Sequence, residues 1–427
     1  MTTARRPLPA AATAGGLRSR RSFALFWAGQ GASSLGYFVS MVAIPLLAIT
    51  RLGASTFEVT ALEALEWAPA MFIGLYAGVL VDRSRRKRQI MMTASLVQAA
   101  AIGSIPVTAA AGVITIGSVF AAVFTSGLAS VFFQTASPSF LRGMVPADQL
   151  VTANARLQGS TSAAQISGPP LGGVLVQVTG AANAVVVDAV SFLACMLALA
   201  VIRVDEPAAA QPGQSVRAEV MEGLRYIGAS AVLRSTAVVS TLANLLLTAI
   251  GAVEVVFLVR VVGVAAGSVG VLLAITGAGG LAGALATGPL HRRYGTSLIA
   301  RLALACTAPF AMLMPLTHRG AGLALFATGA FVSCFGIVVT GITFASIRQV
   351  ACPRRMLGRV SSVFRLLMSV SMPAGALAGG ILGQDLGLRD GLLVITAVLT
   401  VVGLGSAAGA LRRAPDLSLP VSADSPG

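Results

Sequence analysis

The sequence predicts an all-helical protein that crosses a membrane many times. Apolar windows of about 20 residues, each long enough to span a bilayer, follow one another along the 427 residues. The polar joints between the windows are alternately rich and poor in arginine. The second half of the chain also repeats positions of the first half. These observations together predict two helical bundles of one design.

The composition agrees with a protein that lies mostly in lipid. Hydrophobic residues make up 56% of the chain and charged residues 11%, and the mean hydropathy is +0.86. Soluble domains carry about 25% charged residues. The net charge of +15 would also suit nucleic-acid binding. The cations follow the membrane joints instead of forming an aromatic-interleaved patch, so we expect no nucleic-acid partner and contact with anionic lipid at the cytoplasmic face.

Twelve apolar segments are expected to be transmembrane helices. The N-terminal six-helix bundle, residues 22–203, contains the segments 23–48, 57–81, 90–110, 113–137, 157–179 and 181–202. The C-terminal six-helix bundle, residues 234–411, contains 235–258, 267–290, 297–317, 321–346, 361–384 and 390–411. Glycine and proline inside these segments are compatible with helix, because neighbouring helices satisfy the freed backbone groups.

The cations orient the chain in the membrane. If both termini are cytoplasmic, 26 of the 30 Lys and Arg residues lie in the tails, in the cytoplasmic joints or at the adjoining helix ends. The other side keeps Arg51, Arg260, Arg319 and Arg389. Cytoplasmic joints of membrane proteins are enriched in Lys and Arg. We therefore expect both termini in the cytoplasm.

Three segments lie outside the two bundles. Residues 1–21 and 412–427, rich in Ala, Pro, Ser and Arg, are expected to be disordered tails, the first of them basic. Residues 204–233 are expected to form a cytoplasmic linker between the bundles. Within the linker, the segment Val216 to Ile227 is amphipathic and is expected to lie along the inner membrane surface.

The sequence contains no pattern of an enzyme or of a metal centre. The four cysteines and two histidines are not spaced as metal ligands or as a disulfide framework. A phosphate-binding loop, a dinucleotide fingerprint and a nucleophile elbow are all missing from the sequence. We therefore expect no catalytic activity, no metal and no cofactor.

The internal repeat predicts the architecture. At an offset of 207 residues, Pro146, Leu150, Gly168, Gly172, Gly173, Leu175 and Gly180 match Pro353, Leu357, Gly375, Gly379, Gly380, Leu382 and Gly387. At an offset of 210 residues, Gly78, Leu80 and Arg83 match Gly288, Leu290 and Arg293. Two six-helix halves joined by a cytoplasmic linker are the plan of a transporter that rocks about a site between its halves near mid-membrane.

Four acidic residues lie at membrane depth. Glu63 and Glu66 belong to the second expected helix, Asp188 to the sixth and Glu254 to the seventh. A central acid costs about 2.5 to 3.5 kcal/mol on insertion scales, so it normally faces a wet cavity or a partner. Such carboxylates attract cations and exchange protons, which makes all four candidates for substrate binding and proton coupling, Glu66 first. The alternatives are a water-exposed outer vestibule for Glu63 and Glu254, and a structural hydrogen bond to a neighbouring helix for Asp188.

Polar side chains at helical spacing predict a wet interior. They are Gln30, Ser34 and Tyr37 in the first helix, Ser126, Ser130 and Gln134 in the fourth, and Thr241, Asn244 and Thr248 in the seventh. We interpret these three stripes as the lining of a cavity. For each serine or threonine taken singly, a hydrogen bond that joins two helices is an equal alternative.

The joint after the second helix and the middle of the fifth helix carry a family resemblance. Gly78, Leu80, Asp82, Arg83, Arg86 and Lys87 resemble the loop signature of the major facilitator superfamily. The run Gly168 to Gly173 resembles the motif of its drug antiporters. The likeness spans the whole chain, and Pro138 to Asn154, Val187 to Phe192 and Glu222 to Tyr226 are similar to the bacterial macrolide and siderophore exporter branch.

The resemblance implies a secondary active transporter in the plasma membrane of a bacterium. It implies proton-coupled efflux of an amphipathic drug-like or natural-product small molecule by alternating access, and we expect a monomer. Gly78, Asp82, Arg83, Arg86 and Lys87 would form a gating motif, while Gly168, Pro169, Gly172 and Gly173 would form a helix-five hinge. We expect Gly78 to permit close approach of a neighbouring helix. We expect Asp82 to contact the N-terminal end of the eleventh helix or nearby arginines, in one state only. A solvated charge cluster that fixes topology is the alternative for Arg83 to Arg88.

The sequence also departs from the family pattern. Arg85 stands where the loop signature has glycine, the fourth helix lacks the arginine of many proton-coupled drug antiporters, and Tyr37 stands where many relatives of the branch have aspartate. Two usual supports of proton coupling are thus absent. An importer of a polar nutrient is one alternative, for which only Arg365 approaches mid-membrane as a cation. A non-transporting receptor or scaffold is another, and it would not need the loop signature or the central acids.

Overall fold

The protein is built from helices. A computed structural model describes residues 11–202 and 216–408. The first half contains α1 (Ala11–Thr50), α2 (Thr56–Arg83), α3 (Lys87–Ala110), α4 (Ile116–Met144), η1 (Ala147–Gln149), α5 (Leu150–Thr179), α6 (Ala181–Ala184) and α7 (Val186–Val201). The second half contains α8 (Val216–Ala229), α9 (Ala231–Phe257), η2 (Leu258–Val262), α10 (Ala266–Tyr294), α11 (Thr296–Thr307), η3 (Ala308–Leu313), η4 (Gly320–Gly322), α12 (Leu323–Ala351), α13 (Arg354–Asp385) and α14 (Leu388–Ala408).

Ten helical stretches in the described chain are long and apolar enough to cross a membrane. Each of the twelve segments expected from the sequence coincides with helix, and the two that are missing from the ten are α2 and α5. These helices have 28 and 30 residues, a sufficient length. Helix α2 contains Glu63 and Glu66, and the first half of α5 is rich in Asn, Gln, Ser and Thr.

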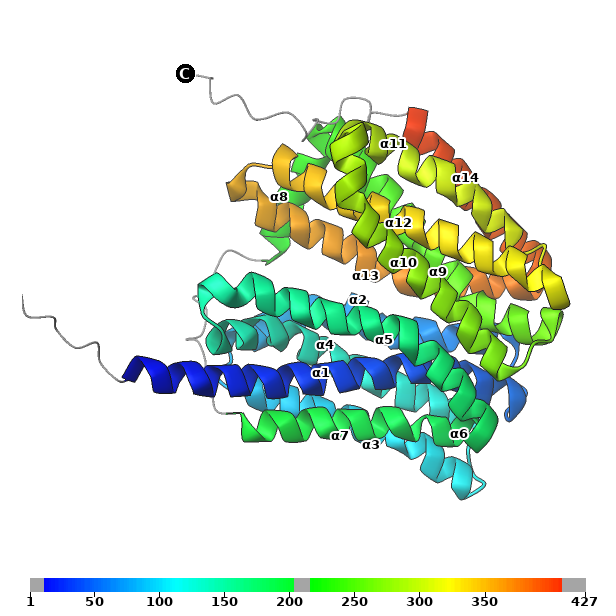
Figure 1. Cartoon of the computed structure of the whole chain (residues 1–427), viewed down its shortest axis with the longest axis horizontal. Coiled ribbons are helices and arrows are strands. Elements are labelled where there is room, and N and C mark those ends of the chain that lie inside the picture. Colours follow the sequence, from blue (N-terminus) through cyan, green and yellow to red (C-terminus); the bar gives the residue numbers. More distant parts are fainter. Residues whose placement is uncertain (1–10, 203–215, 409–427) are drawn as a thin grey trace, which may run out of the picture.

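The helices pack as two groups of the same design (Figure 1). In the first half α1 contacts α5 and α7, α2 contacts α4, and α3 contacts α4 and α7. In the second half α9 contacts α13 and α14, α10 contacts α12, and α11 contacts α12 and α14. Each pairing in one half therefore has its counterpart in the other. The two halves meet where α2 packs on α13 and α5 packs on α10.

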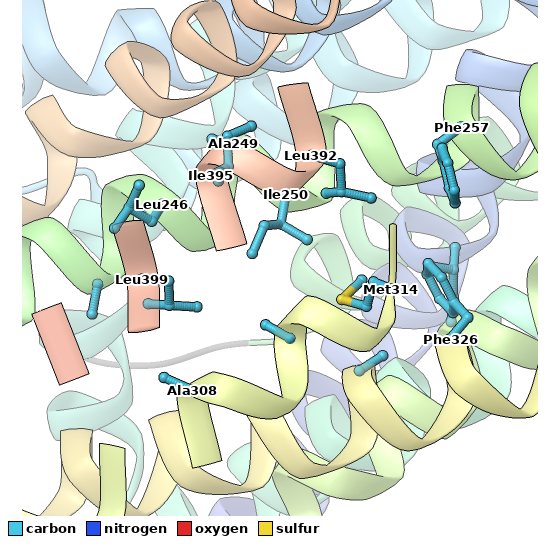
Figure 2. Packing of buried hydrophobic residues seen from close by; sticks show 14 of the residues in the cluster. Leu246, Ala249, Ile250, Phe257, Ala308, Met314, Phe326, Leu392, Ile395 and Leu399 are labelled. Carbon is cyan, nitrogen blue, oxygen red and sulfur yellow. The ribbon is translucent and has the colours of Figure 1, made fainter. Parts of the chain in front are cut away.

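Side-chain packing within each half is apolar. Figure 2 shows the core of the second half, where Leu246, Ile250 and Phe257 of α9 lie near residues of α14 and of the η3 region. Phe257, Phe326 and Leu399 are fully buried in this cluster. A second cluster joins α1, α2, α3, α4 and α7 in the first half. Both clusters include a residue of the opposite half, Leu46 in one and Val256 in the other.

The sequence repeat is also a repeat of backbone geometry. Gly180 ends α5 with φ of 85°, and its counterpart Gly387 follows α13 with φ of 89°. These values lie in the left-handed region, which glycine enters without steric cost. Glycine at the same place in each half thus lets the chain turn sharply into the next helix.

The four arginines on the arginine-poor side have structural partners. Each side chain donates hydrogen bonds to a backbone carbonyl group at a helix end or in a joint, where such groups lack helical partners. The acceptors are Ala109 for Arg51, Ala54 for Arg260, Val262 for Arg319 and Thr317 for Arg389. We call this side of the molecule the arginine-poor end. The exceptions to the arginine sorting thus hold the joints of this end together.

Two expectations about the segments outside the bundles can be compared with the structure. The prediction of a disordered tail over residues 1–21 is wrong from residue 11 onward, because α1 begins at Ala11. The alanine-rich start of this segment has a high helix propensity and continues the apolar helix. The amphipathic segment of the linker is helix α8, which packs on α13 and α9. Residues 1–10, 203–215 and 409–427, which include the expected C-terminal tail, lie outside the described residues.

Candidate functional site

The two halves are closed against each other at the arginine-poor end. A Cβ atom at Gly173 of α5 would lie 2.5 Å from the carbonyl oxygen of Ala266 in α10. On the other flank, a Cβ atom at Gly380 of α13 would collide with Thr60 of α2. Gly173 and Gly380 are repeat partners, so the same close approach occurs twice around the interface. Arg260 of the second half adds hydrogen bonds to the Ala54 carbonyl in the joint before α2 and to the hydroxyl of Thr56, the first residue of α2.

At the opposite, arginine-rich end the same four helices are separated from their partners. Among the described residues, Gly78 of α2, Gly159 of α5 and Gly358 of α13 would accept a Cβ atom without any contact to another element within 4 Å. At Gly288 of α10 the only nearby atom belongs to Arg292 of the same helix. The interface is therefore closed at the arginine-poor end and open at the arginine-rich end, in agreement with the arrangement of the helices in Figure 1.

The helix-five motif lies at the closed contact. Gly168, Pro169, Gly172 and Gly173 are all buried. A Cβ atom would collide with Phe38 of α1 at Gly168, with Val39 of α1 at Gly172 and with α10 at Gly173, and the Pro169 carbonyl occupies the space that a Cβ at Gly270 would need. The close packing expected of this motif is therefore present. It joins α5 to its own half on one face and to α10 on the other.

Three of the predicted acids are gathered near the interface. Glu63 and Glu66 lie one turn apart on α2, and Glu63 is within electrostatic range of both Glu66 and Glu254 of α9. The Glu63 carboxylate lies 4.0 Å from the position of a Cβ at Gly251, also on α9. Glu254 is only 6% exposed, which argues against the water-exposed vestibule considered for it. Acids of the two separate halves thus lie within electrostatic range of each other near the interface.

Glu66 and Asp188 surround the side chain of Tyr37. Glu66 lies where α2 crosses α4 so closely that a Cβ at Gly127 would collide with the Glu66 backbone carbonyl. The Glu66 carboxylate interacts with the Tyr37 hydroxyl of α1, and Asp188 of α7 is also within electrostatic range of this hydroxyl. Tyr37 therefore lies within electrostatic range of acids of both α2 and α7.

Asp188 also takes part in the packing of its own half. It is 2% exposed, and the Ser191 hydroxyl on the same helix lies 3.5 Å from its Oδ1 atom. A Cβ at Gly36 of α1 would lie 2.8 Å from the Asp188 Cα atom, so α1 and α7 cross tightly here. A structural contribution by Asp188 is therefore present alongside its place near Tyr37.

The polar stripes are joined by hydrogen bonds in several places. Gln30 donates from Nε2 to the Ser137 hydroxyl of α4 at 3.3 Å, which links α1 to α4. Asn244 donates from Nδ2 to the Ser371 hydroxyl of α13 at 2.7 Å. Within α4, Gln134 donates to Ser130 at 2.7 Å, and Gln134 itself is exposed. Ser34 is half-buried on α1. Helix-joining bonds thus account for Gln30 and Asn244 in this conformation.

The loop signature lies at the open, arginine-rich end. Arg83 and Arg86 are exposed, and Gly78 has no neighbour within 4 Å. The expectation of a close approach at Gly78 is wrong for this conformation, because the halves are apart at this end. Lys87 is 3% exposed, so the solvated-cluster interpretation is wrong for this residue. The side chain of Asp82 lies outside the described part of the structure.

The second half contains a cavity that the sequence reasoning missed. It has a volume of about 430 Å³ and lies among α9, α11, α12 and α13. Arg348 and Arg365 both line it, together with Asn244 of the predicted stripe. The hydropathy pattern gives Arg348 only a topological role, because it places this residue at the cytoplasmic end of its helix. The spacing of Thr340, Phe344 and Arg348 places them on one face of a helix, and this pattern could have indicated the cavity.

The site combines buried carboxylates, amides and a cavity, and its chemistry is that of binding. Carboxylates can hold and release protons and can attract cations, while arginines attract anions. Among the described residues, no group of three or more potential metal ligands lies together. Movement of the halves about this region would expose its groups to one membrane side at a time.

Comparison with known proteins agrees with this arrangement. Residues 13–424 match the family of transmembrane secretion effectors. The chain is 28% identical to the multidrug efflux pump Tap of Mycolicibacterium fortuitum over 399 residues, which cover 90% of this chain and 93% of Tap. It is 24% identical to macrolide efflux protein A of Streptococcus pyogenes over 391 residues, with 90% and 94% covered.

Solved structures share the fold at low sequence identity. A bacterial homologue of the lysosomal transporter Spinster, in an inward-facing and unoccupied conformation, matches with a TM-score of 0.72 at 13% identity, covering 91% of this chain and 96% of that one. The nucleoside transporter NupG matches with a TM-score of 0.71 at 11% identity, covering 92% and 98%. The chain belongs to the transmembrane secretion effectors of the major facilitator superfamily, and it is a multi-pass membrane transporter and not an enzyme.

Proposed function

We propose that this protein exports an amphipathic drug-like or natural-product small molecule in exchange for protons. The names of the relatives, a multidrug efflux pump and a macrolide efflux protein, support efflux and this substrate class. The chain would cross the plasma membrane twelve times as a monomer, with α2 and α5 among the spans and both termini in the cytoplasm. The arginine-rich end would face cytoplasmic anionic lipid.

The observation that carries the proposal is that Glu63 lies within electrostatic range of Glu254 across the interface of the two halves. The two carboxylates belong to α2 and α9, and Glu254 is buried while Glu63 is half-buried. Like charges repel each other, and the repulsion is stronger where water is partly excluded. Two ionised carboxylates here would therefore oppose closure of the arginine-poor end. A bound proton would remove this repulsion.

This linkage gives the exchange cycle its direction. Protons that enter from outside would neutralise the acids and allow the arginine-poor end to close. The site would then open to the cytoplasm, where the acids release their protons and substrate binds. The ionised acids would favour separation at the arginine-poor end, and the substrate would leave to the outside. Closure of the arginine-poor end would thus depend on whether the carboxylates are protonated, and such a dependence is required for proton coupling.

Glu66 is the proposed contact for a cationic group of the substrate. It lies between Glu63 and Tyr37 and is one turn farther from the closed end than Glu63. The loop signature from Gly78 to Lys87 would close the arginine-rich end in the opposite state, and the helix-five motif would act as the hinge. A polar-nutrient importer or a receptor finds less support, since both named relatives are efflux proteins.

The proposal is tested by transport in vesicles that contain the full chain. Ethidium, an amphipathic cation, is the probe, and its movement is measured under imposed pH gradients for wild type and for Glu66→Gln, Glu66→Asp and Glu63→Gln. Glu66→Gln is expected to abolish proton-driven transport and to weaken ethidium binding more than binding of a neutral analogue. Glu66→Asp is expected to keep part of the activity, and Glu63→Gln to flatten the pH dependence.

Asp148→Asn is the matched control, because Asp148 is an exposed acid in the short η1 turn just before α5. It should transport as wild type does. Wild-type rate and pH dependence in both Glu66→Gln and Glu63→Gln would refute coupling through the acids of α2. Activity in the wild type without any response to the pH gradient would refute proton coupling itself.

A further inference from the structure

The cavity in the second half combines positive charge with an apolar wall. Its volume of about 430 Å³ falls within the range of small-molecule pockets, about 300 to 1,000 Å³. Leu304, Phe344 and Met368 contribute apolar surface. Arg348 of α12 and Arg365 of α13 contribute the charge. The cavity thus has the two properties that an amphipathic ligand with an acidic group requires.

The two arginines have no acidic partner inside the described part of the protein. Glu222 of α8 pairs with Arg359, and no acid in the described ranges pairs with Arg348 or Arg365. The Nε atom of Arg348 is buried and has no hydrogen-bond partner among the described residues. A buried guanidinium group is costly unless it is paired or faces water. An anion in the cavity would supply the missing partner.

Local packing holds Arg348 in place for such a ligand. Its guanidinium carbon lies 4.4 Å from the centre of the Phe364 ring, a cation–π arrangement. Arginine suits this position because its planar group stacks on an aromatic ring while its edge still donates hydrogen bonds to a carboxylate or phosphate. Phe364 precedes Arg365 in α13, so the same turn of the helix fixes one arginine and carries the other.

We propose that this cavity binds the acidic group of an amphipathic ligand, a carboxylate or a phosphate, between Arg348 and Arg365. The apolar part of the ligand lies against Phe344, Met368 and Leu304. The charge preference is opposite to that of the acids Glu63 and Glu66 of α2, so the protein would offer sites of opposite sign in different places. That the ligand is also transported depends on the proposed function, whereas its binding does not.

Equilibrium binding to the purified full chain in phosphatidylcholine nanodiscs tests the proposal. The probes are naphthaleneacetate and naphthaleneacetamide, which share a ring system and differ in charge, and radiolabelled probe is measured by equilibrium dialysis. Wild type is expected to bind the acetate at least about tenfold more tightly than the amide, because only the acetate offers a charged acceptor to the guanidinium groups. Arg348→Gln should remove this preference and leave amide binding unchanged. Arg348→Lys should restore only part of it, because lysine lacks the planar edge.

Arg355→Gln is the matched control, since Arg355 is an exposed arginine of α13 that does not line the cavity. It should bind both probes as wild type does. Unchanged amide binding shows that a variant is folded, and Arg365→Gln provides a second variant with the same expectation as Arg348→Gln. Equal binding of the two probes by wild type would overturn the proposal, as would equal losses in Arg348→Gln and Arg355→Gln.

Phosphatidylglycerol in the nanodiscs distinguishes the two sources of an acidic group. If this lipid competes with naphthaleneacetate in wild type and not in Arg348→Gln, the cavity receives a lipid headgroup. If it does not compete, the ligand is a free amphipathic acid. Both results support the anion site. Because no pH gradient is used, this experiment can succeed or fail independently of the vesicle transport test of proton coupling.

Discussion

The contact between α5 and α10 is predicted to control which end of the transporter is closed. In Gly173→Ala the new methyl group would lie 2.5 Å from the Ala266 carbonyl oxygen and 3.1 Å from the Gly267 Cα atom. Both are backbone atoms, so no side chain can move aside and the helices must separate. Inserting a methyl group into packed structure costs about 1 to 3 kcal/mol. The cost applies only while the arginine-poor end is closed.

This cost should appear as a change in conformational populations. An energy of that size corresponds to about a 5- to 150-fold change in the equilibrium between the two states. The populations can be measured by pulsed electron paramagnetic resonance in a background without the four cysteines. One label pair at Val113 and Leu386 reports on the arginine-poor end, and another at Gln89 and Val350 reports on the arginine-rich end. All four positions are exposed.

Gly173→Ala is expected to lengthen the distances at the arginine-poor end and to shorten those at the arginine-rich end. Gly159→Ala in the same helix is the control, because its methyl group would meet nothing within 4 Å. Both variants gain the higher helix propensity of alanine, about 1 kcal/mol, so this effect cancels in the comparison. If the two variants give the same distance distributions, the α5–α10 contact does not hold the arginine-poor end closed.

Two further predictions concern the loop signature and the orientation. Asp82→Asn should reduce transport strongly at unchanged expression and substrate binding, whereas Arg85→Gln, an exposed neighbour, should not; equal losses would favour a general surface-charge effect. In intact cells and a cysteine-free background, an impermeant thiol reagent should label Val113→Cys and should not label Gln89→Cys. Labelling of Gln89→Cys from outside would reverse the proposed orientation.

The helices could be predicted from the sequence because the bilayer requires a certain length and an apolar composition of each span. Within the described residues all twelve expected segments coincide with helix, although α2 and α5 are not among the ten stretches that are long and apolar enough to cross a membrane. The positions at which the helices begin and end could be predicted less well. α1 extends back to Ala11 and α12 forward to Ala351, beyond the apolar stretches, because a helix does not have to stop where the lipid does.

The candidate site was predictable as a set of residues and not as an arrangement. The free-energy cost of an acid inside the membrane identifies Glu63, Glu66 and Glu254 one by one as candidates. Their meeting depends on how α2 of one half packs near α9 of the other, which no local pattern encodes. Arg348 was not predicted as a site residue, because an arginine is also common at a cytoplasmic helix end for topological reasons. Only the packing of Phe364 and the adjoining cavity shows a different environment.

The glycine contacts and the acids of α2 together suggest how one movement serves both gates. α2 touches α13 at Thr60, near the arginine-poor end, and is free of contacts at Gly78, near the other end. These residues are 18 positions apart, or about 27 Å along a helix. A rigid helix of this length cannot press on the opposite half at both places when the halves are inclined to each other. Closing the Gly78 end therefore requires release at Thr60. Glu63 lies one turn from Thr60, so a change in its charge acts where this release must begin.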